Sequence, residues 1–200
     1  KPQMGVVALK AETIELAPAV LGEVDLIKTI QLLPGVSNNG EGSAGFNVRG
    51  GAVDQNLVLL DEAIIYNTSH FFGLFSVFNN DAIKNVKLYK GDIPARFGGR
   101  TSSVLDVRQK EGNNKDLELN GGIGLISSRL AVESPMFNKK GSFLLAGRTT
   151  YAQLFSGLLD DLGNSNISFY DLNLKTNYEI NENNKVYIYT RNNRFNCIYQ

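Results

Sequence analysis

The stretch from Tyr170 to Ile180 (YDLNLKTNYEI) alternates without a break between two kinds of residue. Every second residue from 170 to 180 is apolar except Thr176, namely Tyr170, Leu172, Leu174, Tyr178 and Ile180. The residues between them are all polar. Successive side chains of a β-strand point to opposite faces, so this segment predicts a strand with one apolar and one polar face.

Shorter segments of the same kind lie on both sides of this strand. Residues 181–184 (NENN) predict a turn, and residues 185–191 resume a strand. Upstream, residues 116–125, 129–133 and 143–148 alternate as well, with a change of register that predicts a tight turn or bulge around Ser127-Ser128.

The connections between these strands differ in length. The links at 137–140 and 181–184 are short, whereas 151–167 is long. Transmembrane barrels combine strands of about ten residues with short turns at one end and long loops at the other. A soluble β-sandwich shows the same alternation, and alternation alone favours the sandwich.

Residues before Gly112-Asn113-Asn114 follow a mixed pattern. Apolar spacing predicts a helix over 24–33 that Pro34-Gly35 ends, and residues 56–60 and 63–66 predict a hairpin around Asp61-Glu62. Further strands are expected at 46–49, 86–90 and 103–108, and a capped helical turn at 80–83. We therefore expect an α+β domain over 1–112 and an antiparallel sheet over 113–200.

The composition excludes several functional classes. Twenty basic residues balance twenty acidic ones, which argues against a nucleic-acid partner. A single cysteine (Cys197) and a single histidine (His70) argue against a disulfide framework, a multi-histidine metal site and most Cys–His catalysis. No run approaches the length of a transmembrane helix.

Residues 40–45 (GEGSAG) fit the pattern G-x-G-x-x-G. A dinucleotide site needs this pattern after a strand and at the start of a helix, whereas here it leads into the strand-like segment 46–49. Asp61 and Glu62 are adjacent on a predicted hairpin and are expected to form its turn, not an acid–base pair. No catalytic residue, metal site or cofactor is predicted.

Five segments in this order resemble the plug domain and first barrel strands of TonB-dependent outer-membrane receptors, especially the Bacteroidetes type with a carboxypeptidase-like domain upstream. They are LGEVDLIKTIQLLPGV (21–36), FNVRGG (46–51), NLVLLDEAIIYN (56–67), IKNVKLYKGDIPARFGGRTSSVLDVRQKEG (83–112) and LISSRLAVESP (125–135).

The resemblance implies a plug domain (1–112) followed by the first strands of a 22-stranded barrel (113–200) in the outer membrane of a Gram-negative bacterium. It implies transport, not catalysis: gated uptake of a siderophore, glycan, cobalamin or peptide. The implied partners are the TonB–ExbB–ExbD complex, outer-membrane lipid and, in some relatives, a surface lipoprotein. The remaining strands and the TonB-contacting segment are expected outside residues 1–200.

The resemblance also suggests particular residues. Plug loops at 52–55 and 68–72 are expected to face outward, with Asp54, Gln55, His70, Phe71 and Phe72 facing the substrate. An alternative of equal weight is that Phe71 and Phe72 pack in the plug core.

Two cations are expected to contact the barrel wall. They are Arg49 of the Arg-Gly motif, and Lys90, where many relatives have arginine. Lysine is a point charge and cannot form the two-pronged contact of a guanidinium, so a bidentate contact at position 90 is not expected.

Two other functions remain alternatives. The chain can be read as a soluble secreted β-rich binding module, or as a nucleotide-dependent enzyme built on residues 40–45. The outward face of the 170–180 strand distinguishes the first of these, because contact with lipid requires that face to stay apolar.

Overall fold

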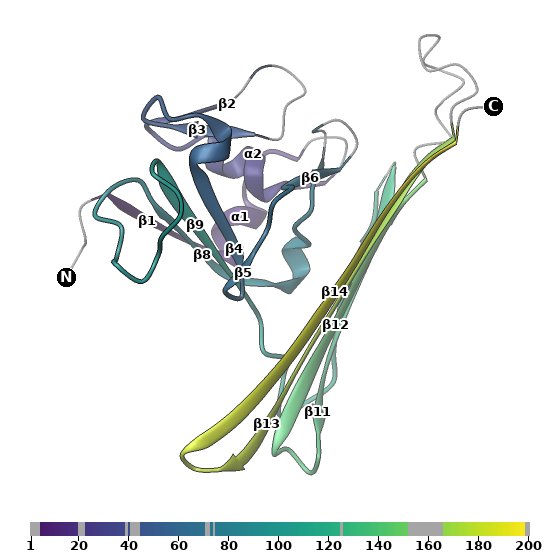
Figure 1. Cartoon of the computed structure of the whole chain (residues 1–200). Helices are drawn as coiled ribbons and strands as arrows, with labels where there is room; N and C mark the ends of the chain where they lie inside the picture. Colours follow the sequence, from purple (N-terminus) through teal and green to yellow (C-terminus); the bar gives the residue numbers. More distant parts are fainter. Residues whose placement is uncertain are drawn as a thin grey trace. The chain divides into compact units, whose positions relative to one another are not determined.

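The computed structural model of the chain describes residues 5–19, 23–38, 40, 45–70, 73, 75–124, 126–151 and 166–198. These residues form two compact units. The first contains residues 5–19 and 24–109, and the second contains Glu23 together with the described residues from Lys110 onward. The first unit is an α+β fold and the second is an antiparallel sheet, as the sequence predicts (Figure 1).

The first unit is built around a mixed sheet in the order β1-β8-β9-β4-β5. β4 and β9 are parallel, and the other neighbours are antiparallel. Two small antiparallel pairs, β2–β3 and β6–β7, complete the unit. Its elements are β1 (Val6–Lys10), α1 (Ala11–Glu15), α2 (Leu26–Gln31), β2 (Val36–Asn38), β3 (Phe46–Val48), η1 (Val53–Gln55), β4 (Asn56–Leu60), β5 (Ala63–Ile64), β6 (Ser69–His70), β7 (Phe75–Ser76), η3 (Asn80–Ala82), β8 (Ile83–Tyr89) and β9 (Ser103–Gln109).

Both faces of this sheet are covered. On one face Leu26, Ile27 and Ile30 of α2 pack with Leu105 and other buried apolar residues of the strands. The other face carries a smaller cluster of Leu57, Leu59, Tyr89 and Val104, against which Ile93 and Phe97 pack. Burial on both faces explains why residues 57–60 of β4 form a continuous apolar run.

Helix α2 begins and ends where its sequence requires. The Asp25 carboxylate accepts a hydrogen bond from the Lys28 amide at 3.1 Å, which satisfies one of the free donors of the first turn. Pro34 and Gly35 follow the helix, and Gly35 has a φ of 76°, a conformation that glycine adopts without strain. The helix is shorter than the 24–33 range that apolar spacing predicts. It begins after Asp25, which is its cap, and beyond Gln31 the Leu32 and Leu33 amides bond to residues three positions earlier.

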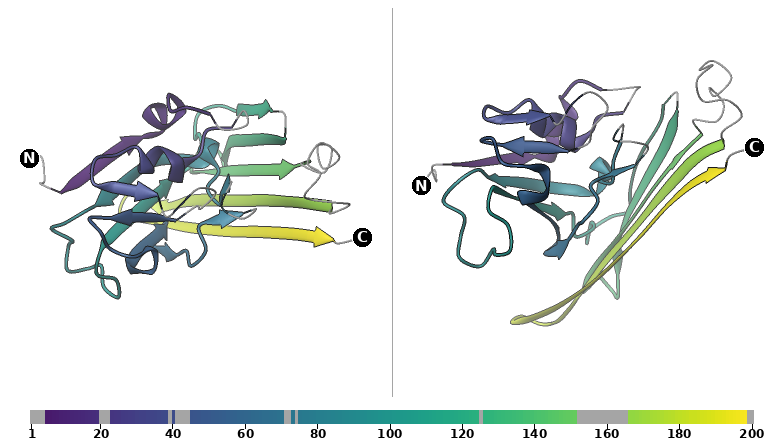
Figure 2. Two further views of the ribbon diagram at one scale, coloured as in Figure 1. Left: turned by 90° about the horizontal axis from the view of Figure 1, so that it is seen from above. Right: turned by 45° about the horizontal axis from the view of Figure 1, so that its top comes forward.

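The second unit is an antiparallel meander in the order β10-β11-β12-β13-β14, and Figure 2 shows its strands running side by side. Its strands are β10 (Glu118–Ile123), β11 (Ser127–Met136), β12 (Gly141–Thr150), β13 (Asn166–Asn181) and β14 (Asn184–Ile198).

The expected tight turn around Ser127-Ser128 is present, but it lies just before these two residues. β10 already ends at Ile123, and the Gly124 amide donates to the Ser127 carbonyl at 2.8 Å across a tight turn. Ser128 pairs with Ile123 inside the ladder. The apparent change of register is therefore a hairpin placed before Ser127.

On β13 of the second unit the apolar face is largely exposed, whereas most of the polar face is buried. On β13 the Leu172 and Ile180 side chains are 44% and 58% exposed. The opposite face of β13 is buried at Asp171, Asn173, Lys175 and Asn177. A sheet of a water-soluble protein has the opposite arrangement, with apolar side chains inward.

Candidate functional site

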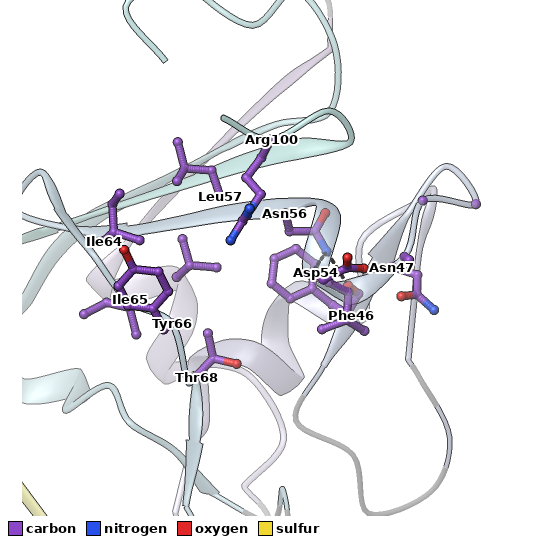
Figure 3. Close-up of a pocket in the computed structure, with 15 residues that line it drawn as sticks. Phe46, Asn47, Asp54, Asn56, Leu57, Ile64, Ile65, Tyr66, Thr68 and Arg100 are labelled. Carbon is purple, nitrogen blue, oxygen red and sulfur yellow. Dashed lines mark hydrogen bonds between the residues drawn. The ribbon is translucent and has the colours of Figure 1, made fainter. Parts of the chain in front are cut away.

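A pocket of about 660 Å³ opens in the first unit, between the start of β4 and the segment that follows β5 (Figure 3). Its size lies within the range of small-molecule sites. Aromatic and aliphatic side chains line it together with a few polar and charged ones. The labelled lining residues are Phe46, Asn47, Asp54, Asn56, Leu57, Ile64, Ile65, Tyr66, Thr68 and Arg100.

Asn56 holds the base of the pocket together. Its amide nitrogen donates to the Phe46 carbonyl at 2.6 Å, and its amide oxygen accepts from the Ser103 hydroxyl at 2.7 Å. These bonds join β3, β4 and β9 at the pocket. Because Asn56 is buried and uses both ends of its amide, its role is to fix the pocket wall.

Gly51 allows the rim of the pocket to close against the start of β9. A Cβ at Gly51 would lie 2.2 Å from the Ser102 Oγ, so no larger residue fits without displacing Ser102. The Ser102 hydroxyl donates to the Val48 carbonyl at 3.0 Å. The Gln55 side chain accepts from the Ala52 amide at 3.2 Å and shapes the short helix η1 on this rim.

Opposite charges line the pocket. Asp54 on η1 and Arg100 before β9 are both exposed, and Figure 3 shows the Arg100 side chain extending into the pocket. Tyr66 is 84% exposed and offers an aromatic face. This combination can bind a polar organic molecule through charge, hydrogen bonds and stacking.

The residues expected to face the substrate lie in different surroundings. Asp54 lines the pocket, and its neighbour Gln55 lies on η1. His70 is 7% exposed and belongs to β6, where it pairs with Phe75, so it is not in an open loop. Phe71 and Phe72 lie outside the described residues.

Sequence reasoning missed Tyr66 and Arg100. Both carry a recognisable signal: Tyr66 is a large aromatic beside the polar run 67–69, and Arg100 is a cation directly after Gly98-Gly99. The spacing of these residues in the chain gave no reason to bring them together.

Arg49 and Lys90 lie near each other at one end of the sheet of the first unit. The Lys90 ammonium donates to the Pro34 carbonyl at 2.8 Å, and the Arg49 amide donates to the Gly35 carbonyl at 3.1 Å. The Arg49 guanidinium lies over Gly91, where a Cβ would be 2.9 Å from its Nη1 atom. Within the described part of the chain, neither cation forms an ion pair.

The described residues hold no cluster of three or more His, Cys, Asp or Glu side chains that could bind a metal ion. None of the helices in the described ranges is long and apolar enough to cross a membrane.

Residues 6–104 match the family described as the TonB-dependent receptor plug domain. A comparison with curated proteins finds no significant match.

Solved structures show the same fold over nearly the whole chain. The siderophore receptor PirA from Pseudomonas aeruginosa is 18% identical with a TM-score of 0.67, and the match covers 98% of this chain and 36% of that one. The ferric enterobactin receptor PfeA from the same organism is 17% identical with a TM-score of 0.69, covering 100% and 34%. The copper transporter OprC is 12% identical with a TM-score of 0.66, covering 98% and 31%. The chain thus spans about a third of the length of these proteins.

Proposed function

We propose, from the match of residues 6–104 to the TonB-dependent receptor plug domain, that the chain is part of an outer-membrane receptor that gates energy-coupled uptake. The substrate is one that is too scarce or too large to enter by diffusion through open pores. The work of the chain is binding and gating, without covalent chemistry.

One observation carries the proposal, namely that β13 of the second unit exposes apolar side chains and buries polar ones. Leu172, Ile180 and other apolar side chains are exposed, while Asp171 and its polar neighbours on β13 are buried. This is the arrangement of barrel strands that face lipid on one side and a polar lumen on the other. A soluble binding module would expose the polar face instead, so the observation opposes that alternative.

In this function the pocket of the first unit receives substrate. We assign Asp54, Arg100 and Tyr66 as contacts, with Gln55 on the same rim and His70, Phe71 and Phe72 as further candidates. PirA, PfeA and OprC act on siderophores, ferric enterobactin and copper by their names. For this chain siderophores, glycans, cobalamin and peptides all remain candidate substrates.

Arg49 and Lys90 are proposed to meet carboxylates of the barrel wall. The support is that neither has an ion-pair partner within the described part of the chain. Energy would come from a TonB–ExbB–ExbD complex, and outer-membrane lipid would surround the barrel. A Bacteroidetes-type receptor with an upstream carboxypeptidase-like domain, working with a surface lipoprotein, is the finer form of this proposal.

Cell fractionation tests the location and the barrel. An antibody to residues 113–200 should detect, in the host, a large outer-membrane band whose gel mobility shifts on boiling. A soluble band near the chain's own 21.9 kDa would contradict the proposal and support a free binding module.

Growth tests the transport. A strain lacking the receptor gene is expected to grow poorly when one substrate is limiting, among iron-siderophore, cobalamin, glycan and peptide. Deleting TonB in the same host should give the same defect for that substrate. Normal growth of both strains on every one of these limiting substrates would contradict energy-coupled uptake.

A further inference from the structure

Arg148 on β12 lies buried between two carboxylates of the second unit. Its Nη1 atom is 2.6 Å from the Glu23 Oε1 atom, and its Nε atom donates to the Asp171 Oδ2 atom at 3.0 Å. The side chains of Arg148, Glu23 and Asp171 are 2%, 8% and 0% exposed. Buried charges of this kind persist only when they are paired, so each side chain depends on the others.

The two carboxylates are held in different ways. Asp171 lies directly across from Arg148 in the β12–β13 ladder, so the sheet itself keeps it in place. Glu23 comes from a point in the sequence far from these strands. It is held by Arg148 and by the Ser127 hydroxyl, which donates to its Oε2 atom at 2.7 Å. If Glu23 is displaced, Arg148 still pairs with the Asp171 carboxylate and is not left as an unpaired buried charge.

Directly after Glu23, the contacts of the chain change from residues of the second unit to residues of the first. Asp25 caps α2 and accepts from the Ser76 backbone amide at 2.5 Å, and the Asn80 side-chain amide donates to the Val24 carbonyl. These residues belong to the first unit, whereas Glu23 groups with the strands of the second. Among the described residues at this point, Glu23 binds the strands of the second unit through its carboxylate, and its backbone also forms a β-bridge.

We propose that Arg148 and Ser127 form a releasable binding site for the Glu23 carboxylate, which we call the Glu23 seat. The carboxylate is bound at rest and is released when energised uptake moves the residues that precede α2. The release step rests on the proposed transport function, but the seat does not. Loss of the Glu23 charge should free this segment while the Arg148–Asp171 pair keeps the sheet intact.

Thiol labelling tests the seat in outer-membrane vesicles holding the full-length receptor. Cysteine is placed by Val24→Cys, with Cys197→Ser to remove the chain's own thiol, and biotin maleimide is the probe. Glu23→Gln removes a charge-assisted contact, so labelling should become about tenfold faster. Unchanged labelling would overturn the seat.

Glu133→Gln is the matched control. Glu133 is another buried carboxylate of the same unit, and it pairs with Lys110 at 3.4 Å instead of Arg148. Its neutralisation should leave labelling of the Val24→Cys protein unchanged. Equal acceleration by both variants would mean a general loosening of the unit, and the proposal would fall.

Labelling in growing host cells tests the release. With Glu23 intact, the Val24→Cys receptor should be labelled faster in cells that contain TonB than in cells that lack it. Equal rates alongside TonB-dependent growth on the receptor's substrate would overturn the release and leave the proposed function standing. Growth that never depends on TonB would contradict the proposed function itself and the release with it.

Discussion

The wall of the pocket depends on the hydrogen bonds of one buried side-chain amide, that of Asn56. Asn56→Asp keeps the acceptor for Ser103 but places an oxygen where the Phe46 carbonyl now receives a proton, at a donor–acceptor distance of 2.6 Å. A buried polar group left without its bond costs about 1–3 kcal/mol, and a charge costs more. We expect the amides of β3 and β4 in the full-length protein to exchange with deuterium markedly faster in Asn56→Asp.

Ser103→Ala is the milder comparison for this prediction. It removes only the hydroxyl that donates to Asn56 and leaves the Phe46 contact in place. Its effect on exchange should be smaller than that of Asn56→Asp. Equal exchange in all three proteins would show that the amide does not hold the pocket wall.

The Asp61-Glu62 turn is strained, and its two residues respond differently to glycine. Both have positive φ, 46° and 74°, in a two-residue hairpin turn that favours Asn-Gly. Glu62 is 77% exposed and pairs with Arg108 at 3.1 Å, an interaction worth about 0–1 kcal/mol. Burial lowers the pKa of Arg108, but Asp106 and Glu62 outweigh this and raise it. A guanidinium is charged at neutral pH whether or not Glu62 is present.

Glu62→Gly should therefore change the free energy of unfolding of this hairpin by no more than about 1 kcal/mol, because relief of strain offsets the lost pair. Asp61→Gly should be worse, since the Asp61 carboxylate accepts from the Gln109 amide at 3.2 Å. Deuterium exchange at β4 and β5 measures both. A Glu62→Gly protein that exchanges faster than Asp61→Gly would refute the argument.

At the scale of elements, local pattern predicted the strands well. The hairpin of β4 and β5, the end of α2 before Pro34-Gly35 and the long strands β13 and β14 all follow from alternation and turn residues near in sequence. The polar segment at 40–45 joins the antiparallel strands β2 and β3, as its lead into a strand predicted, and no helix follows it.

What the sequence could not predict depends on partners far along the chain. β1 was missed because Val6–Lys10 gains its identity as a strand by pairing with β8, more than seventy positions later. The pocket was only partly predicted, since Arg100 and Tyr66 meet Asp54 through the fold alone. The buried position of His70 follows from its pairing with Phe75, which a loop-like composition hid.

The apolar face of β13 yields a prediction for one element. Leu174 sits opposite Leu145 on β12 and Thr190 on β14, in the middle of the sheet. An arginine there would cost about 2–4 kcal/mol if that face meets lipid at the membrane midplane. Leu174→Arg should therefore reduce the heat-modifiable outer-membrane form of the full-length protein. Asn183→Arg, in the exposed β13–β14 turn, is the control and should assemble normally; equal assembly of both would remove Leu174 from the lipid face.

At the scale of the whole molecule, the open edges of the second sheet decide whether these residues can function alone. β10 and β14 end the strand order within the described residues, and β14 runs over Asn184–Ile198. In lipid each unpaired backbone group of such an edge costs several kcal/mol, so the sheet needs further strands to close. Residues 1–200 exported behind a signal peptide should fail to enter the outer membrane, and protease should degrade them, whereas the full-length protein should resist protease and shift on heating. A stable, membrane-inserted product of residues 1–200 would mean that its edges pair with each other or with a second copy, and the proposal of a larger barrel would have to be abandoned.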